Sequence, residues 1–264
     1  QYTTLAENLA SHGYLVAGPT PTYSANLTVL HGQPVHATTA GDPPAFDATD
    51  LHTGPAAQAG DRLAGVWAAD ARFAAAQLAA LDRPGHLSGP FSGHVDGTRT
   101  AYLGHSFGGA AALEACRTDP HCAAAADIDG TQYGPVVHTG LGKPLLILAS
   151  QNSCVTGTCQ PSGTADLTDQ ATARTLLTAG TGPAWCYQIE GSRHFNFSDY
   201  AAYYLAAPIR HLLALGPIDG HLGLRITNAY LAAFLDHTLQ GRNEPLLTGK
   251  SAPYPQVRAQ RTPR

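Results

Sequence analysis

The stretch GHSFGGAAALEAC, residues 104–116, decides the fold that we predict for this chain. The apolar run at residues 99–103 predicts a strand before it, and its own alanine-rich second half favours a helix. Ser106 therefore stands where a strand turns sharply into a helix. The pattern G-x-S-x-G at such a turn indicates a nucleophile elbow, in which the serine oxygen projects above the edge of a sheet.

The neighbours of Ser106 have mechanical and electrostatic reasons to be there. A side chain beside a strained turn would clash with the backbone. We therefore expect that positions 104 and 108 are glycine because neither has room for a Cβ atom. The helix directs its free N–H groups and positive end toward the serine, which favours a negative oxygen. The backbone N–H of Phe107 is the expected oxyanion donor. A chance glycine-rich turn is the alternative, and the flanking strand and helix argue against it.

The rest of the chain alternates between strands and helices. We predict strands at 14–17, 123–128, 144–149 and 184–189. A capping box at 4–7 begins a first helix that ends at residue 11. Further helices are predicted at 56–82, 165–178 and 226–239, and within 197–215, where Pro208 breaks the helix. Strands that are apolar throughout indicate a mostly parallel sheet with helices on both faces. We therefore predict one α/β-hydrolase domain over residues 1–264. Residues 19–55 and 82–98 are long loops and candidate lids, and residues 241–264 are a tail.

Composition excludes several classes of function. The chain has 264 residues, a formal net charge of −4 and 44% hydrophobic residues, which suits one large domain with a substantial core. No cluster of lysine and arginine suggests nucleic acid, and no run of about 18 apolar residues suggests a membrane span. We expect a monomer, and we keep a lipid surface as a candidate partner although no basic amphipathic helix supports one.

The five cysteines fall into two close pairs and one single residue. Cys116 and Cys122 flank a tight turn, Cys154 and Cys159 flank the four residues Val-Thr-Gly-Thr, and Cys186 stands apart. Both pairs are spaced to close small disulfide loops, which predicts an oxidising compartment and a secreted or extracytoplasmic protein. A metal site is the weaker interpretation, because the spacings are not Cys-x-x-Cys, and we expect neither metal nor cofactor.

A serine nucleophile needs a base, and the chain has thirteen histidines. In this fold class the acid and then the histidine follow the serine along the chain. His194 lies just past the last predicted strand, where a loop can hold its imidazole over the elbow. His121 lies in a cysteine-flanked turn, and His138 has no evident reason to face the site, so both are weaker candidates.

The acid is expected at the end of a strand. Residues 144–149 are followed by Ser-Gln-Asn, which holds no carboxylate, whereas the strand before it ends in Asp127-Ile-Asp129. Asp129 lies at the carboxyl end of that strand, where ligand sites form in open parallel sheets, so we prefer it. Asp127 lies deeper and is expected to be structural, and Asp166 and Asp169 are outside alternatives.

Four segments together resemble the platelet-activating factor acetylhydrolase family of α/β-hydrolases. They are GHSFGG at 104–109, DIDG at 127–130, GSRHFNFSD at 191–199 and LASHGYLVA at 9–17. In that family the acid follows the strand directly after the nucleophile helix, so the resemblance also implies Ser106, Asp129 and His194 as the triad. It covers most of residues 1–200 and suggests a bacterial member.

One departure from the family concerns the N-terminus. The family has an apolar strand and a His-Gly-containing loop, the source of the second oxyanion N–H, which here would lie upstream of Gln1. The chain also lacks methionine, so we expect the natural protein to be longer. His31-Gly32 is similar but lies inside the long loop, and we assign it no role.

We expect a serine esterase that works through an acyl-enzyme without a cofactor. The resemblance implies short-chain acyl groups on small-molecule or phospholipid-like esters. Tyr23, Phe46 and Phe91 in the two loops either form an acyl pocket or stay in solvent. A polyester hydrolase or cutinase-like esterase, an amidase or peptidase, and a non-catalytic hydrolase-like fragment are the alternatives.

Overall fold

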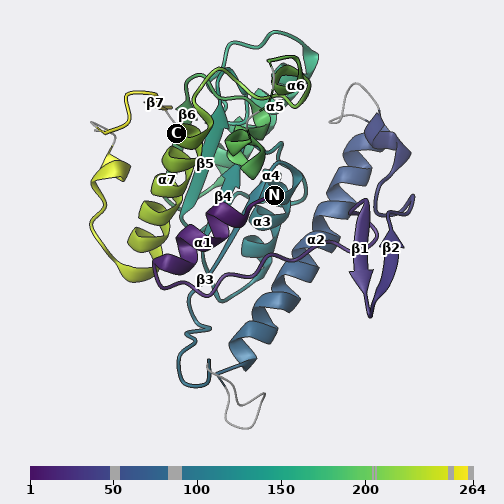
Figure 1. The fold of residues 1–264 in the computed structure, drawn as a ribbon, viewed down its shortest axis with the longest axis vertical. Helices are drawn as coiled ribbons and strands as arrows, with labels where there is room; N and C mark the ends of the chain where they lie inside the picture. Colours follow the sequence, from purple (N-terminus) through teal and green to yellow (C-terminus); the bar gives the residue numbers. More distant parts are fainter. Residues whose placement is uncertain (48–53, 83–90, 204, 206, 249–252, 261–264) are drawn as a thin grey trace.

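The computed structural model of this protein describes residues 1–47, 54–82, 91–203, 205, 207–248 and 253–260 (Figure 1). Within these residues, a five-stranded sheet has the order β3-β4-β5-β6-β7. Its strands are β3 (Thr100–His105), β4 (Cys122–Ile128), β5 (Leu145–Ser150), β6 (Ala184–Ile189) and β7 (Val257–Ala259). Strands β3 to β6 run parallel, and β7 pairs antiparallel with β6. The mostly parallel sheet that the sequence predicts is therefore present.

Helices cover both faces of this sheet. One core joins α1 (Thr3–Ser11) and α7 (Gly220–Gln240) to one set of strand residues, such as Ala126 and Leu148. The other core joins α2 (Gly54–Ala80), α3 (Phe107–Thr118) and α5 (Thr164–Ala179) to the alternate set, such as Ala125 and Ile147. Side chains of a strand point alternately to opposite faces, so a run that is apolar throughout fills both cores.

Helix α7 shows how local chemistry sets an element's ends. The Asp219 side chain accepts the N–H of Leu222 at 2.9 Å, which caps the first turn. The helix therefore begins at Gly220, earlier than the predicted residue 226. It ends where expected, because Gly241 takes the left-handed conformation with φ of 69°.

The N-terminal segment differs from the prediction in two ways. The capping box at 4–7 is wrong, because the Thr4 hydroxyl donates to Asp199 instead of capping α1. Residues 14–17 do not form a strand, and Leu15 is exposed. An extended run needs a neighbouring strand for its backbone hydrogen bonds, and within the described residues β3 pairs with β4 alone.

The first long loop contains more structure than the sequence indicated. Residues 19–55 include a hairpin of β1 (Leu27–Leu30) and β2 (Gln33–His36), which lies on the outer side of α2 in Figure 1, and a 3-10 helix, η1 (Pro44–Asp47). His31 and Gly32 form the hairpin turn, with φ of 50° and 78°. Residues 48–53 of this loop and residues 83–90 of the second lie outside the described residues.

The C-terminal region also corrects two predictions. Residues 241–264 are not merely a tail, because they include η4 (Pro245–Thr248) and the strand β7. Pro208 does not break a helix but lies in the first turn of α6 (Ala207–Leu212), where a missing N–H is tolerated. Short helices complete the fold: α4 (Val136–Thr139), η2 (His194–Phe197) and η3 (Asp199–Ala202).

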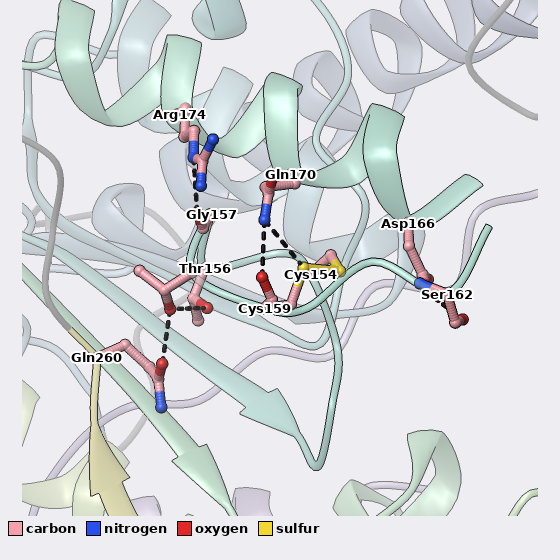
Figure 2. Close-up of a disulfide and its surroundings, with 10 residues drawn as sticks. Cys154, Thr156, Gly157, Cys159, Ser162, Asp166, Gln170, Arg174 and Gln260 are labelled. Atoms are coloured by element: carbon pink, nitrogen blue, oxygen red, sulfur yellow. Dashed lines mark hydrogen bonds between the residues drawn. A yellow bond between two sulfur atoms is a disulfide. The ribbon is translucent and has the colours of Figure 1, made fainter. Parts of the chain in front are cut away.

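Both predicted disulfides are present. Cys116–Cys122 joins the end of α3 to the start of β4, and Cys154–Cys159 closes a loop after β5. Figure 2 shows α5 holding this second loop, with Gln170 donating to the Cys159 carbonyl at 2.8 Å and Arg174 to that of Gly157 at 2.8 Å. Cys186 is a buried free thiol. In the described part of the chain, none of the helices combines the length and apolar character that crossing a membrane requires.

Candidate active site

Ser106 lies at a strained turn between β3 and α3. Its φ of 58° and ψ of −132° are unusual for a residue with a side chain. The turn is held from two sides, because the Ser106 N–H donates to the Ile128 carbonyl at 2.9 Å and its own carbonyl accepts the Gly109 N–H at 2.8 Å. Ser106 therefore stands directly beside the carboxyl end of β4.

The two glycines of the G-x-S-x-G pattern have different reasons to be glycine. A Cβ at Gly104 would run into the backbone carbonyl of Gly108, so the expectation of no room is right there. At Gly108 it is wrong, because a Cβ would meet no atom within 4 Å outside its own helix and its neighbours. Gly130 is a crowded glycine that the sequence did not single out, because a Cβ there would strike the carbonyl of Ser106 and the carboxylate of Asp127.

Asp129 follows β4 and also has a positive φ, of 53°. Its N–H donates to the Leu148 carbonyl at 2.7 Å, which ties it to β5. One carboxylate oxygen, Oδ1, accepts the Ser150 N–H at 2.7 Å, and the other, Oδ2, lies 2.9 Å from Nδ1 of His194. Burial by itself raises the pKa of Asp129. The hydrogen bond and charge of His194 and the Ser150 N–H outweigh burial and hold this pKa below its ordinary value, so the carboxylate is ionised.

His194 is the first residue of η2, on the loop after β6. The side chain of Asn196 holds this loop, because its Oδ1 accepts the N–H groups of Arg193 at 2.8 Å and Gly216 at 2.6 Å. The His194 side chain is 33% exposed, whereas that of Asp129 is 3% exposed. Since Nδ1 donates to Asp129, Nε2 of the neutral ring is the basic nitrogen that remains to take a proton.

The structure makes the hydrogen bond between His194 and Asp129, the first of the two in a triad, but not the second. Among the described residues, the hydrogen bonds include none between Ser106 Oγ and the His194 ring. The imidazole ring of His105, the residue before Ser106, does contact that of His194, with centroids 4.4 Å apart. Catalytic hydrogen bonds are often long without substrate and tighten in the bound complex.

The other candidate acids bind groups elsewhere, and the other candidate histidines are exposed. Asp127 is fully buried, accepts the Gly130 N–H at 3.0 Å and the Gln132 amide at 2.9 Å, and has a pKa raised well above its ordinary value by burial. Asp127 thus lies deeper than Asp129, and its structural role stays a prediction. Asp166 accepts from Ser162, Asp169 accepts from Thr131, and His121 and His138 are exposed.

An aromatic group surrounds the side chain of Phe107. The ring centroid of Phe107 lies 4.9 Å from that of Trp67, 5.5 Å from Tyr133 and 5.8 Å from Phe46. Of the three loop aromatics, Phe46 thus joins the site, whereas Tyr23 and Phe91 are exposed. Sequence reasoning missed Trp67 and Tyr133 here, because the helical period of α2 explained Trp67 as a core residue.

Asp199 is a further residue whose partner the sequence did not indicate. Its carboxylate accepts the N–H groups of Thr3 at 2.8 Å and Thr4 at 3.2 Å and the hydroxyl of Thr4 at 2.6 Å. The carboxylate therefore caps α1 from the segment that carries His194. The sequence signal that could have drawn attention to Asp199 is its place in the segment GSRHFNFSD.

Comparisons with known proteins show which family this chain resembles. A family model described as platelet-activating factor acetylhydrolase, isoform II, matches residues 88–245. A protein of Arthroderma benhamiae named "Probable 1-alkyl-2-acetylglycerophosphocholine esterase" is 32% identical over 171 residues, which are 60% of this chain and 42% of that protein. The chain thus spans less than half the length of this relative.

A solved structure has the same fold. It is a ferulic acid esterase from Streptomyces cinnamoneus, and the two chains are 28% identical with a TM-score of 0.75. The alignment covers 98% of this chain and 69% of the esterase chain. The predicted α/β-hydrolase fold and the family resemblance are therefore confirmed. The family match runs past the expected limit near residue 200 and begins at residue 88.

Proposed function

This chain belongs to the family of platelet-activating factor acetylhydrolase, isoform II, and we propose that it is a serine hydrolase that cleaves carboxylic esters. The observation that carries the proposal is the hydrogen bond between His194 and Asp129, at the sheet edge where Ser106 occupies a strained elbow. A buried, ionised carboxylate that orients an accessible imidazole is the arrangement that activates a serine.

In the proposed mechanism, His194 Nε2 takes the proton of Ser106 as Oγ attacks the ester carbonyl. The N–H of Phe107 and the positive end of α3 stabilise the oxyanion, and Asp129 stabilises the imidazolium. The carbon–oxygen bond to the alcohol then breaks, and His194 returns its proton to the leaving alcohol. Water, deprotonated by His194, attacks the acyl-enzyme and releases the acid and the free serine.

The substrate class that we favour is a short-chain acyl ester on a small or phospholipid-like molecule. The family match supports this choice, and so does the name of the Arthroderma relative, an esterase of an acetylated glycerophosphocholine. The two disulfides support a secreted protein, because such bonds persist in oxidising compartments.

The aromatic group favours a second candidate, an ester of an aromatic acid. Phe46, Trp67 and Tyr133 converge on Phe107, the residue after the nucleophile, and the structural neighbour is a ferulic acid esterase. If an aromatic acyl group stacks there, Phe46→Ala lowers kcat/KM for methyl ferulate by about tenfold and leaves that for p-nitrophenyl acetate nearly unchanged. Phe91→Ala, at an exposed aromatic residue, is the matched control.

The direct test is Ser106→Ala. This variant is expected to abolish hydrolysis of p-nitrophenyl acetate and covalent labelling by a fluorophosphonate. Ser162→Ala, whose hydroxyl bonds to Asp166, is the control and keeps both. A folded wild-type protein that neither hydrolyses esters nor takes the label is a non-catalytic hydrolase-like protein. Relative rates on an acetylated phosphocholine lipid, methyl ferulate and a polyester film separate the esterase classes.

A further inference from the structure

We propose that His105 and Tyr2 form a positioning pair, which fixes where the imidazole of His194 lies relative to Ser106. This inference rests on the proposed function, because it assigns a role within that mechanism. His105 fills the first variable position of the G-x-S-x-G pattern, which leaves its side chain free to vary in chemical type. The contacts of this particular histidine explain what it does here.

His105 is bonded at both ring nitrogens. Its Nε2 lies 2.9 Å from the backbone oxygen of His194, and its Nδ1 lies 2.7 Å from the hydroxyl of Tyr2. The two imidazole rings also pack together, with centroids 4.4 Å apart and planes inclined by 36°. One side chain thus holds both the backbone and the ring of His194.

The direction of each hydrogen bond follows from its partner. A carbonyl oxygen only accepts, so Nε2 of His105 carries the proton and donates to His194. In the neutral ring Nδ1 is then an acceptor, and the Tyr2 hydroxyl donates to it. Burial and the neighbouring charge of His194 lower the pKa of His105 to about 4, so the ring is neutral near pH 7. A neutral ring also adds no repulsion when His194 takes up the serine proton.

The sheet alone does not fix the distance between the Ser106 turn and the His194 loop, and the pair connects the two. Ser106 follows β3 and His194 follows β6, and two strands lie between them in the sheet. His105 is the residue before the nucleophile, so its bond to the His194 carbonyl connects the two loops directly. A displacement of about 1 Å between reacting groups lowers a rate by about 100-fold, so such a connection matters for catalysis.

Tyr2 is itself anchored beside the His194 loop. Asp199, in that loop, accepts the N–H groups of Thr3 and Thr4, which fixes the backbone next to Tyr2. Burial, Tyr200 and Asp199 raise the pKa of Tyr2, so its hydroxyl remains a donor. The groups that face His105 are therefore Tyr2, His194 and its partner Asp129, enclosed by the rings of Phe195 and Phe197, each 6.0 Å away.

Three variants separate the contacts. His105→Phe keeps a flat ring and removes both hydrogen bonds, His105→Gln keeps an N–H donor for the His194 carbonyl, and Tyr2→Phe removes only the outer hydroxyl. Tyr14→Phe is the control, because it removes a similar hydroxyl, bonded to Asp236 at 2.7 Å, from the same N-terminal segment.

With p-nitrophenyl acetate, kcat is expected to fall about 10- to 100-fold in His105→Phe while KM changes less than about threefold. His105→Gln recovers part of this loss, and Tyr2→Phe loses about three- to tenfold. Tyr14→Phe keeps the wild-type kcat. Thermal unfolding of each variant establishes that the protein is folded, and if His105→Phe does not fold, Tyr2→Phe decides the question.

A second measurement does not depend on turnover. Proton NMR reports the far-downfield resonance of the Nδ1 proton that His194 shares with Asp129, assigned by its loss in His194→Gln. The resonance is expected to shift or broaden in His105→Phe and Tyr2→Phe and to stay unchanged in Tyr14→Phe. An unchanged kcat, or a lower kcat with an unchanged resonance, overturns the positioning role. A folded wild type without esterase activity overturns the proposed function instead, and the resonance still decides whether the pair positions His194.

Discussion

His194 Nδ1 and Asp129 Oδ2 lie 2.9 Å apart, although 65 positions separate the two residues in the chain. The contact connects the loop after β6 to the end of β4, across the strand β5. It directs one nitrogen of His194 to a buried carboxylate, and we propose that the other nitrogen takes the proton of Ser106.

Asp129→Asn is expected to lower kcat for p-nitrophenyl acetate by about 10³- to 10⁴-fold. The amide favours the wrong tautomer of the histidine, and it lacks the negative charge that stabilises the imidazolium. Asp127→Asn is the matched control, two positions earlier in the same segment. It disturbs the bonds to Gly130 and Gln132 and so lowers the unfolding temperature, while kcat per folded molecule stays within about fivefold. Equal losses of kcat in both variants would contradict the assignment of Asp129.

The two glycines of the elbow are expected to respond differently to the same substitution. Gly104→Ala places a Cβ against the carbonyl of Gly108, and the free energy of unfolding is expected to fall by about 3 kcal/mol or more. Gly108→Ala meets open space and lies in the first turn of α3, so stability stays within about 1 kcal/mol of the wild type. Urea unfolding of the two variants measures this difference, and a similar loss in both is the contrary result.

The pKa of His105 predicts a dependence of stability on pH. The folded pKa, about 4, lies below the ordinary value of 6.5, so the unfolded chain binds more protons between these pH values. The contribution of His105 to the free energy of unfolding therefore decreases as the pH falls from 6.5 to 4. The lowered pKa values of Asp129 and Asp199 act below their ordinary value of 3.8, outside this window.

The measurement is urea unfolding of wild type and His105→Phe at several pH values from 7 to 4. Asp127, whose pKa is raised, acts in the opposite direction in part of this window, so the difference between the two proteins is the quantity to compare. The wild type is expected to lose more stability than the variant as the pH falls. Parallel curves would mean that His105 titrates normally in the folded protein.

The number of cysteines that react with iodoacetamide is expected to differ between native, denatured, and denatured and reduced protein. Without reductant, native protein takes no iodoacetamide, because four cysteines are paired and Cys186 is buried with a pKa raised to about 12. Denaturation without reductant exposes one thiol, and denaturation with reductant exposes five. Mass spectrometry counts the labels, and more than one label without reductant would exclude one of the disulfides.

Removing a disulfide tests its contribution to stability. The Cys154→Ala/Cys159→Ala double variant opens a small loop, and the free energy of unfolding is expected to fall by about 2 kcal/mol. The bonds from Gln170 and Arg174 still hold the loop on α5, so the fold is expected to persist. Urea unfolding measures the loss, and Cys186→Ala is the control for loss of a cysteine that closes no loop.

Asp199 is expected to hold the N-terminal helix against the His194 loop. Asp199→Ala removes the acceptor for Thr3 and Thr4, and the loss is expected to be about 1 kcal/mol, as for other helix caps. Limited proteolysis is expected to cut within α1 sooner in this variant. Asp42→Ala, at an exposed aspartate, is the control, and equal cleavage of α1 in both variants would argue against the cap.

Local patterns in the chain were enough to identify the elements that carry the site. Helical and strand periods reflect which side chains face a core, so the strands around Ser106 and Asp129 and the helix after Ser106 lie within a few residues of their predicted positions. The predictions that failed needed a partner from elsewhere. Among the described residues no strand lies beside residues 14–17, whereas β7 forms because it can pair with the edge of β6.

The sequence by itself determined a parallel α/β sheet with a serine elbow, and it narrowed the acid and the base to a few residues, because turns and alternation are encoded within about ten positions. Only the tertiary structure decided which carboxylate meets the imidazole, and that His105 links Tyr2, 103 positions away, to His194. The physical reason is that a hydrogen bond requires two atoms within about 3 Å. That distance depends on strand order and loop anchoring, to which residues far apart in the chain contribute together.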